Sequence, residues 1–167
     1  MRVNESDLDW DETDDGDATF RRKRLADAAG GEGLGASLYE IPPGEKGWPY
    51  HYHEGNEEAV YVLAGSGSIR LDGDTQPLEP GDYVALVPGP DSAHRVVNDG
   101  DEPLRFLVVS EMEHPDVLGY PDSDKVGVYT GSPPGQYDDR RETAYFPRES
   151  EVDFWEGEGE SDPDGGE

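Results

Sequence analysis

Two histidines separated by a single residue, His51 and His53, precede a pair of adjacent glutamates, Glu57 and Glu58. On an extended strand, side chains two residues apart project from the same face, about 6.6 Å apart along the strand. The two imidazoles can therefore face one point, and a carboxylate returning on the next strand can add a third side. His94 is the fourth candidate, so that three of the four histidines in the chain belong to this set.

Three imidazoles and one carboxylate form a donor set that suits a borderline divalent cation: Fe(II), Mn(II), Ni(II), Zn(II) or Cu(II). Four protein ligands on an octahedral ion leave two positions for water, substrate or O₂. Such a site permits Lewis-acid polarisation, water activation or oxygen chemistry. An isolated His-x-His pair is equally compatible with core or surface residues that bind nothing. The additional glutamate and histidine favour one bound metal ion.

Short strands punctuated by glycine and proline are expected to position these residues. Strand-like runs occupy residues 34–41, 48–53, 57–63, 68–71, 76–78, 82–87, 93–97 and 104–110. The dipeptide Asp72-Gly73 is a hairpin turn signal. Regular short strands without a long helical period predict an all-β sandwich or barrel.

Three arginines could face either the interior or the solvent: Arg70, Arg95 and Arg105. On the last barrel strand the expected inward set is Leu104, Phe106 and Val108. We prefer this set because a buried arginine would need an ionic partner. Structural roles are therefore expected for all three arginines, and an inward arginine would instead indicate a carboxylate-binding group.

The order and spacing of the candidate residues resemble the two sequence motifs of the cupin superfamily. The first motif is carried by His51, His53, Glu58 and Gly65, and the second by Gly81, Pro88, His94 and Asn98. The short segment between them, residues 66–80, is similar to that of compact single-domain cupins of the conserved-barrel type (cupin type 2). A Tyr-Pro-Asp sequence at 120–122 is also similar to a subset of these small proteins.

The resemblance implies a single-domain, all-β double-stranded β-helix, or jelly-roll barrel. It implies one divalent metal ion held by His51, His53, Glu58 and His94. The motif spacing selects Glu58 over Glu57, which has the opposite strand parity and should point outward.

Small cupins include dioxygenases, isomerases, epimerases, sugar-binding modules and ligand sensors, so the fold does not fix the function. The resemblance implies a metal-dependent enzyme that acts on a small organic molecule, either a dioxygenase or a sugar or keto-acid isomerase. The alternative is a non-catalytic module that binds or senses a small ligand. No second ionisable group is clearly placed as a general acid or base, so the catalytic residues stay open.

Acidic residues outnumber basic ones by 40 to 13, which gives a formal net charge of −27. The excess is spread along the chain and lysine is scarce, which favours a surface adapted to concentrated salt over an acidic tail for basic partners. At 1 M salt the Debye length falls to about 3 Å and self-repulsion is screened. We therefore expect a halophilic microbe as the source. Neither nucleic acid nor an anionic membrane is expected as a partner, because both require clustered lysine and arginine.

The chain has no cysteine, which excludes disulfides, thiolate nucleophiles and Cys-ligated zinc. No apolar run approaches the roughly 20 residues of a membrane helix, and no signal sequence is recognisable. We expect a cytoplasmic protein that forms a homodimer and binds a small molecule.

Four segments are predicted. Residues 1–17 form an acidic, mostly irregular extension in which Trp10 packs on the barrel or on a neighbouring subunit, and residues 18–112 form the barrel. Residues 113–155 form an irregular extension against the barrel or a partner, and residues 156–167 a disordered acidic tail. The basic run at 18–26 is interpreted as a charged strand or edge that faces the acidic protein, with an anion- or partner-binding patch as the alternative.

Overall fold

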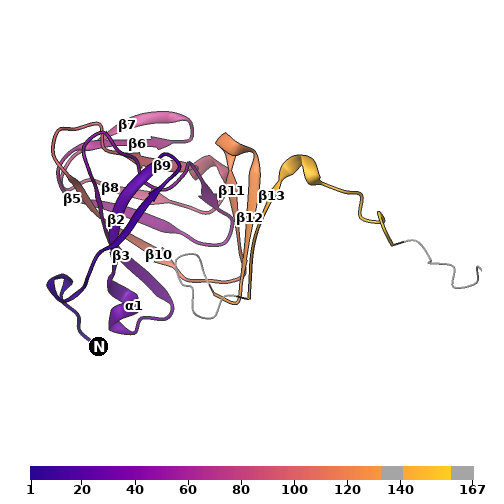
Figure 1. Cartoon of the computed structure of the whole chain (residues 1–167), viewed down its shortest axis with the longest axis horizontal. Coiled ribbons are helices and arrows are strands. Elements are labelled where there is room, and N and C mark those ends of the chain that lie inside the picture. The colour runs from indigo at the N-terminus through magenta and orange to yellow at the C-terminus, as the bar shows by residue number, and fades with distance from the viewer. Residues whose placement is uncertain (133–140, 159–167) are drawn as a thin grey trace, which may run out of the picture.

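Antiparallel sheets make up the computed structural model, which describes residues 1–132 and 141–158 (Figure 1). One sheet has six strands in the order β1-β2-β3-β10-β5-β8, another has three in the order β7-β6-β9, and a third has four in the order β13-β12-β11-β4. The strands are β1 (Asp11–Asp15), β2 (Ala18–Arg24), β3 (Leu34–Ile41), β4 (Tyr52–His53), β5 (Glu58–Ala64), β6 (Gly67–Leu71), β7 (Asp74–Leu78), β8 (Tyr83–Leu86), β9 (His94–Val97), β10 (Leu104–Glu111), β11 (Asp116–Tyr120), β12 (Lys125–Thr130) and β13 (Glu142–Pro147). The described part of the chain has one α-helix, α1 (Leu25–Ala29), and none of its helices is long and apolar enough to cross a membrane. The predicted all-β architecture is confirmed.

The apolar core lies between the six-stranded and the three-stranded sheet. Its buried members are Ala18, Phe20, Tyr39, Ile41, Val60, Val62, Ile69, Leu78, Leu86, Val96, Leu104 and Phe106. On β10, Leu104 and Phe106 belong to this core and Val108 packs against it, as predicted. Arg105 has the opposite parity and pairs outside the core with Glu5 at 2.8 Å.

The other two arginines of uncertain orientation also form ion pairs, Arg70 at an exposed position and Arg95 with only 11% of its side chain exposed. Arg70 lies 3.7 Å above the Tyr50 ring and donates to both carboxylate oxygens of Asp122. Arg95 donates to both carboxylate oxygens of Asp17, at 2.7 and 2.9 Å. Structural contacts account for both side chains, in line with the expectation from the sequence.

The His-x-His segment is less regular than predicted. A strand was expected over residues 48–53, but only Tyr52–His53 forms one, as β4. His51 makes an isolated antiparallel bridge to His94, and its backbone N–H donates to the His94 carbonyl at 3.1 Å. Pro49 has no N–H to give to a ladder, which explains why regular pairing does not extend further back.

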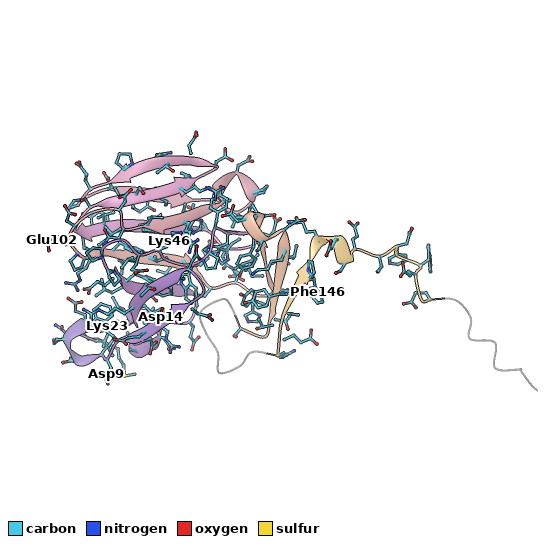
Figure 2. All side chains as sticks on the ribbon, turned by 45° about the horizontal axis from the view of Figure 1, so that its top comes forward. Asp9, Asp14, Lys23, Lys46, Glu102 and Phe146 are labelled. Carbon is cyan, nitrogen blue, oxygen red and sulfur yellow. The ribbon has the colours of Figure 1, made fainter. Side chains whose placement is uncertain are left out.

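The N-terminal segment is more ordered than predicted. Strand β1 pairs antiparallel with β2 and lines up Glu12 with Arg21, so acidic and basic strands face one another. Trp10 lies against the barrel, with Arg21 and Lys23 each 4.6 Å from its ring centroid. The basic run therefore forms a charged strand, β2, as expected, but not the edge of the sheet, because β1 occupies that edge. Asp14 and Lys23 project outward from this part of the barrel (Figure 2).

The C-terminal segment was predicted to be irregular, and this is also wrong. Strands β11, β12 and β13 form a sheet at one side of the barrel (Figure 1), and β4 joins it by pairing with β11. Gly119 lies opposite Tyr52 in that pairing, and the aromatic ring occupies the space that a Cβ at position 119 would need. Most of the predicted disordered tail, residues 159–167, lies outside the described residues.

Candidate metal centre

The four predicted ligands converge at the wall of the barrel. Nε2 of His53 and Nε2 of His94 lie 3.4 Å and 3.5 Å from the same oxygen, Oε2 of Glu58. The ring of His51 is centred 5.2 Å from that of His53 and 4.6 Å from that of His94. Strands β5 and β9 thus carry Glu58 and His94 to the segment that holds the other two histidines.

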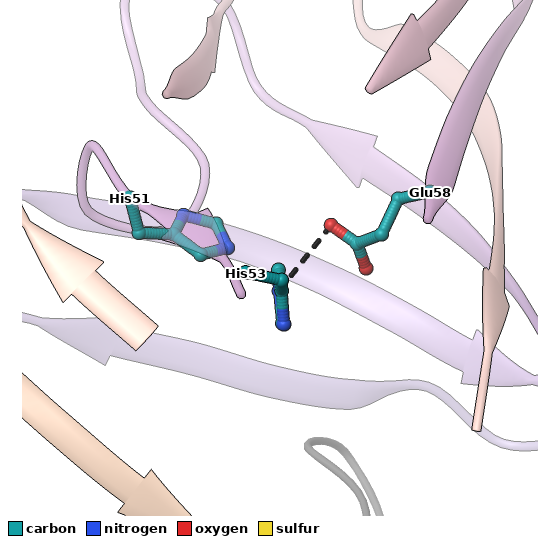
Figure 3. A group of neighbouring side chains, drawn as sticks. All are labelled: His51, His53 and Glu58. Carbon is teal, nitrogen blue, oxygen red and sulfur yellow. Dashed lines mark ion pairs between the residues drawn. The ribbon is translucent and has the colours of Figure 1, made fainter. Parts of the chain in front are cut away.

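Three of these residues form the tightest group. One ligand atom from each of His51, His53 and Glu58 lies within 4.8 Å of the others, and all three side chains point to a shared space (Figure 3). His94 falls outside this group although its ring contacts Glu58. A His/His/Glu set of this geometry is consistent with a divalent metal ion.

The orientation of two imidazoles is fixed by backbone carbonyls. Nδ1 of His51 lies 2.7 Å from the Pro49 carbonyl, and Nδ1 of His94 lies 3.0 Å from the Ser92 carbonyl. A carbonyl can only accept a hydrogen bond, so each Nδ1 must carry the proton. In the neutral ring this leaves the Nε2 lone pair free, which is the state that a metal requires.

His53 is fixed by a buried carboxylate, that of Asp116. Oδ2 of Asp116 accepts from Nδ1 of His53 at 2.6 Å and from Nδ2 of Asn56 at 2.8 Å. Its other oxygen accepts from the backbone N–H groups of Gly55 and Val117. The carboxylate is thus held by four donors and has little freedom to turn away. This carboxylate–histidine pair is typical of the shell that orients metal ligands in proteins.

The surroundings of His51 and His53 shift the pKa values of these two histidines in opposite directions. Burial, together with the neighbouring imidazoles of His94 and His53, lowers the pKa of His51 to about 3. Burial also pulls down the pKa of His53, but Glu58 and Asp116 outweigh it, so that this pKa is raised. Burial alone would raise the pKa of Glu58, yet the opposing imidazoles lower it to about 2. The site therefore holds a carboxylate anion and a neutral His51 at ordinary pH.

These residues open into a cavity of about 380 Å³. Aromatic rings form much of its wall: Tyr39, Trp48, Phe106, Tyr120, Tyr129 and Tyr145. The ring of Tyr120 stacks beside His51, with centroids 6.0 Å apart and planes 23° apart. The barrel and the C-terminal sheet therefore enclose the same cavity.

Three tyrosines of the C-terminal sheet share a chain of hydroxyl contacts. The hydroxyl of Tyr129 lies 3.2 Å from that of Tyr120 and 2.6 Å from that of Tyr145. Burial raises the pKa of Tyr120 to about 12 and also raises the pKa of Tyr129. Both phenols keep their protons at neutral pH and can donate hydrogen bonds.

Asp116 and these tyrosines were not recognised from the sequence. Asp116 lies 63 residues from His53, its partner, and no local pattern marks it. Tyr120 belongs to the Tyr-Pro-Asp sequence that resembles a subset of small cupins. That resemblance marked the residue, but it did not predict that its ring lies beside His51.

The barrel and its cluster of imidazoles and carboxylate define a small β-barrel protein with a group of residues that is consistent with a metal site. Residues 37–110 match the sequence model of the Cupin domain. The structure is similar to that of a provisionally assigned sugar phosphate isomerase from Acidithiobacillus ferrooxidans, with 32% identity, a TM-score of 0.72 and coverage of 81% of this chain and 80% of that one. The chain belongs to the cupin superfamily.

Two further relatives match different shares of this chain and of their own length. A sugar phosphate isomerase of the cupin superfamily from Silicibacter pomeroyi is 29% identical, with a TM-score of 0.69 and coverage of 78% of each chain. Polyketide synthase CurC of Streptomyces cyaneus is 39% identical over 87 residues, which are 52% of this chain and 54% of that protein. The chain thus spans about half the length of this curated relative.

Proposed function

We propose that this protein is a metal-dependent isomerase of a small, sugar-type substrate, with one divalent ion held by His51, His53, Glu58 and His94. The observation that carries the proposal is the convergence of the four side chains on one wall of the cavity, with Nδ1 of every imidazole already bonded to an acceptor. The two similar structures, matched over most of their length, support the isomerase class.

A divalent ion in this site would polarise a carbonyl or hydroxyl oxygen of the substrate. The chain itself contributes orientation and exclusion of water. Asp116 holds His53 with its Nε2 facing Glu58. Tyr120 stays protonated near neutral pH, so it can donate a hydrogen bond to a substrate oxygen but cannot act as a base. The aromatic walls keep the local dielectric low, which strengthens each of these contacts.

A second candidate function is the conversion of an aromatic polyketide-type substrate. It is favoured by the rings in the cavity wall, since Tyr39 and Phe106 stack with their planes only 7° apart and offer flat apolar surface. The similarity to CurC over the barrel points the same way.

The test combines metal analysis with a turnover assay. Protein purified without chelator is analysed for bound metal and then incubated with aldose and ketose phosphates, whose interconversion is followed by NMR. We expect about one divalent ion per chain and interconversion of the substrates without O₂ uptake. The bound ion and the interconversion should both be lost in His51→Ala. Bound iron with substrate-dependent O₂ uptake would establish a dioxygenase instead. Tight ligand binding without turnover would establish a binding module.

We also propose that the chain forms a homodimer and, on the basis of its composition and charge, that its surface is adapted to concentrated salt. Light scattering tests the first. Dialysis into low salt tests the salt adaptation. Circular dichroism should then show loss of structure, because repulsion between the acidic side chains is no longer screened. An unchanged spectrum in low salt would contradict the salt adaptation.

A further inference from the structure

Three tyrosines from three neighbouring strands of the C-terminal sheet converge on the wall of the cavity. Tyr120 lies on β11, Tyr129 on β12 and Tyr145 on β13, and all three side chains line the cavity (Figure 1). The ring centroid of Tyr145 lies 6.0 Å from that of Tyr120 and also 6.0 Å from that of Tyr129. The three rings therefore form one continuous part of the cavity wall, the tyrosine cluster.

The sequence of β12 makes room for the tyrosine cluster and holds it in place. Gly127 lies two residues before Tyr129, on the same face of the strand. A Cβ at position 127 would lie 3.1 Å from a ring carbon of Tyr145 and 3.2 Å from ring carbons of Tyr120 and Tyr129, so the rings occupy the space of the missing side chain. Lys125 is paired with Tyr120, and its Nζ lies 4.9 Å from the Tyr120 ring centroid and 5.8 Å from that of Tyr145. This cation–π contact stabilises the arrangement of the two rings.

The hydroxyl groups of the cluster meet one another beside the cavity. The hydroxyl of Tyr129 stands between the other two, 3.2 Å from that of Tyr120 and 2.6 Å from that of Tyr145. Tyr120 and Tyr129 are buried, whereas 51% of Tyr145 is exposed. A tyrosine that serves only as apolar packing commonly keeps its hydroxyl in water. Two buried hydroxyls gathered in a cavity wall therefore indicate a polar binding surface.

The balance of donors and acceptors in the cluster favours a ligand that brings its own O–H groups. Each phenol has a single proton to donate, and its oxygen can also accept. The contacts among the three hydroxyls use protons of the cluster and leave its oxygens as acceptors, and a buried acceptor without a partner costs free energy. An oxyanion offers acceptors alone, and an aromatic hydrocarbon offers neither donor nor acceptor. An alcohol can donate to a phenol oxygen and accept from a phenol O–H.

We infer that Tyr120, Tyr129 and Tyr145 form a subsite that selects a substrate with several hydroxyl groups. One oxygen of the substrate faces the candidate metal centre, and hydroxyl groups on the following carbons bond to the phenols. The Tyr120 ring stacks beside His51 with centroids 6.0 Å apart, so that one short carbon chain can reach both places. The inference rests on the proposed function in taking this cavity as the substrate site. It favours the sugar-type substrate over the aromatic one.

The test measures selectivity in chelator-treated protein, so that no probe binds through a metal. Xylitol and 1-pentanol have the same number of carbon atoms and differ in their hydroxyl groups. Each is titrated into protein with isotope-labelled tyrosine rings, and the NMR shifts of the rings give the two dissociation constants. The variants are Tyr129→Phe, Tyr145→Phe and the matched control Tyr83→Phe, since Tyr83 is exposed on β8 and lies outside the cavity.

We expect wild type to prefer xylitol and Tyr129→Phe to reduce this preference about fivefold, because one buried hydroxyl is lost. Tyr145→Phe should reduce it less, since its ring is half exposed, and Tyr83→Phe should leave it unchanged. The ratio of the two affinities separates recognition from structural damage, which would lower both affinities together. Circular dichroism checks the fold, and if Tyr129→Phe does not fold, Tyr120→Phe carries the comparison.

The outcomes for the tyrosine cluster and for the proposed function are distinguishable. Equal affinities for the two probes in wild type, no saturable binding of xylitol, or an unchanged preference in folded Tyr129→Phe would overturn the inference. Selective binding of xylitol by a protein that holds no metal and interconverts no sugar phosphates would count against the proposed function alone.

Discussion

The barrel and the C-terminal sheet reach the same cavity with different kinds of side chain. The barrel strands β5 and β9 supply Glu58 and His94, two of the candidate metal ligands. The C-terminal strand β11 supplies Asp116, which orients His53, and Tyr120, which stacks beside His51. The barrel thus provides the donor atoms of Glu58 and His94, whereas His53 lies on β4, the strand that joins the C-terminal sheet. That sheet orients His53 through Asp116 and closes the space around the group. Substitutions in the two regions should therefore differ in how much they impair metal binding and how much they lower stability.

The largest effect is expected from removal of a ligand. His53→Ala deletes an imidazole at the centre of the group and should weaken metal binding by more than about 100-fold, beyond the range typical of outer partners. Metal content after gel filtration and a competition titration with a chromophoric chelator measure this. His114→Ala is the control, because His114 is exposed and lies outside the cavity. A wild-type metal content in His53→Ala would remove the ligand set.

The next effect is expected from the C-terminal sheet. Asp116→Asn places an amide donor where Nδ1 of His53 needs an acceptor, which favours the tautomer with the proton on Nε2 and blocks the metal. We expect metal affinity to fall about 10- to 100-fold and the free energy of unfolding to fall by about 1–3 kcal/mol. Asp122→Asn is the matched control, since Asp122 is exposed and pairs only with Arg70 among the described contacts. If Asp116→Asn bound metal as tightly as wild type, the sheet would have no part in orienting the ligands.

The same division explains what the sequence could predict. His51, His53, Glu58 and the strands around them follow local spacing and alternation, so the barrel and the candidate ligands were recognisable together. Asp116 acts on His53 across 63 residues, and nothing in its own neighbourhood requires that pairing. The inward side of β2 was missed for a similar reason. A run of consecutive basic residues, 21–24, is typical of a charged strand or edge, and only the structure shows that β1 covers the edge and that Arg22 faces the core.

Metal affinity and the stability of the metal-free protein should depend on pH with opposite signs around the pKa of His53. In the metal-free protein the raised pKa of His53 means that a proton occupies the site which the metal needs, so apparent metal affinity should rise up to about tenfold per pH unit until His53 is neutral. His51, with a pKa lowered to about 3, adds nothing near neutral pH. In Asp116→Asn the rise should level off at lower pH, because one group that raises the pKa of His53 is gone. Metal titrations between pH 5 and 9, a range that spans roughly two units on either side of an ordinary imidazole, measure this.

The contribution of His53 to the free energy of unfolding of the metal-free protein should instead decrease as pH rises. The pKa of His53 is raised above its usual 6.5, so its contribution is complete below 6.5 and is lost as pH rises through the folded-state pKa. The pKa of Glu58 is lowered from 4.5 to about 2, so its contribution is present above 4.5 and is lost as pH falls toward 2. Urea unfolding of chelator-treated protein across this range tests both slopes. A metal-free protein whose stability increased steadily from pH 6 to 9 would contradict the assignment of His53.

The smallest effect is expected where the two regions pair. Gly119 on β11 faces Tyr52 on β4, and a Cβ there would overlap the buried ring, so Gly119→Ala must displace either strand. We expect overpacking to cost about 1–3 kcal/mol in the free energy of unfolding. Metal affinity should fall only a few-fold, because His53 shifts with β4 but keeps its bond to Asp116 on β11. Gly33→Ala is the control, as nothing lies within 4 Å of an added Cβ at that position. A loss of metal as large as in His53→Ala, with the fold intact, would mean that the sheet sets the ligand geometry as strictly as the barrel does.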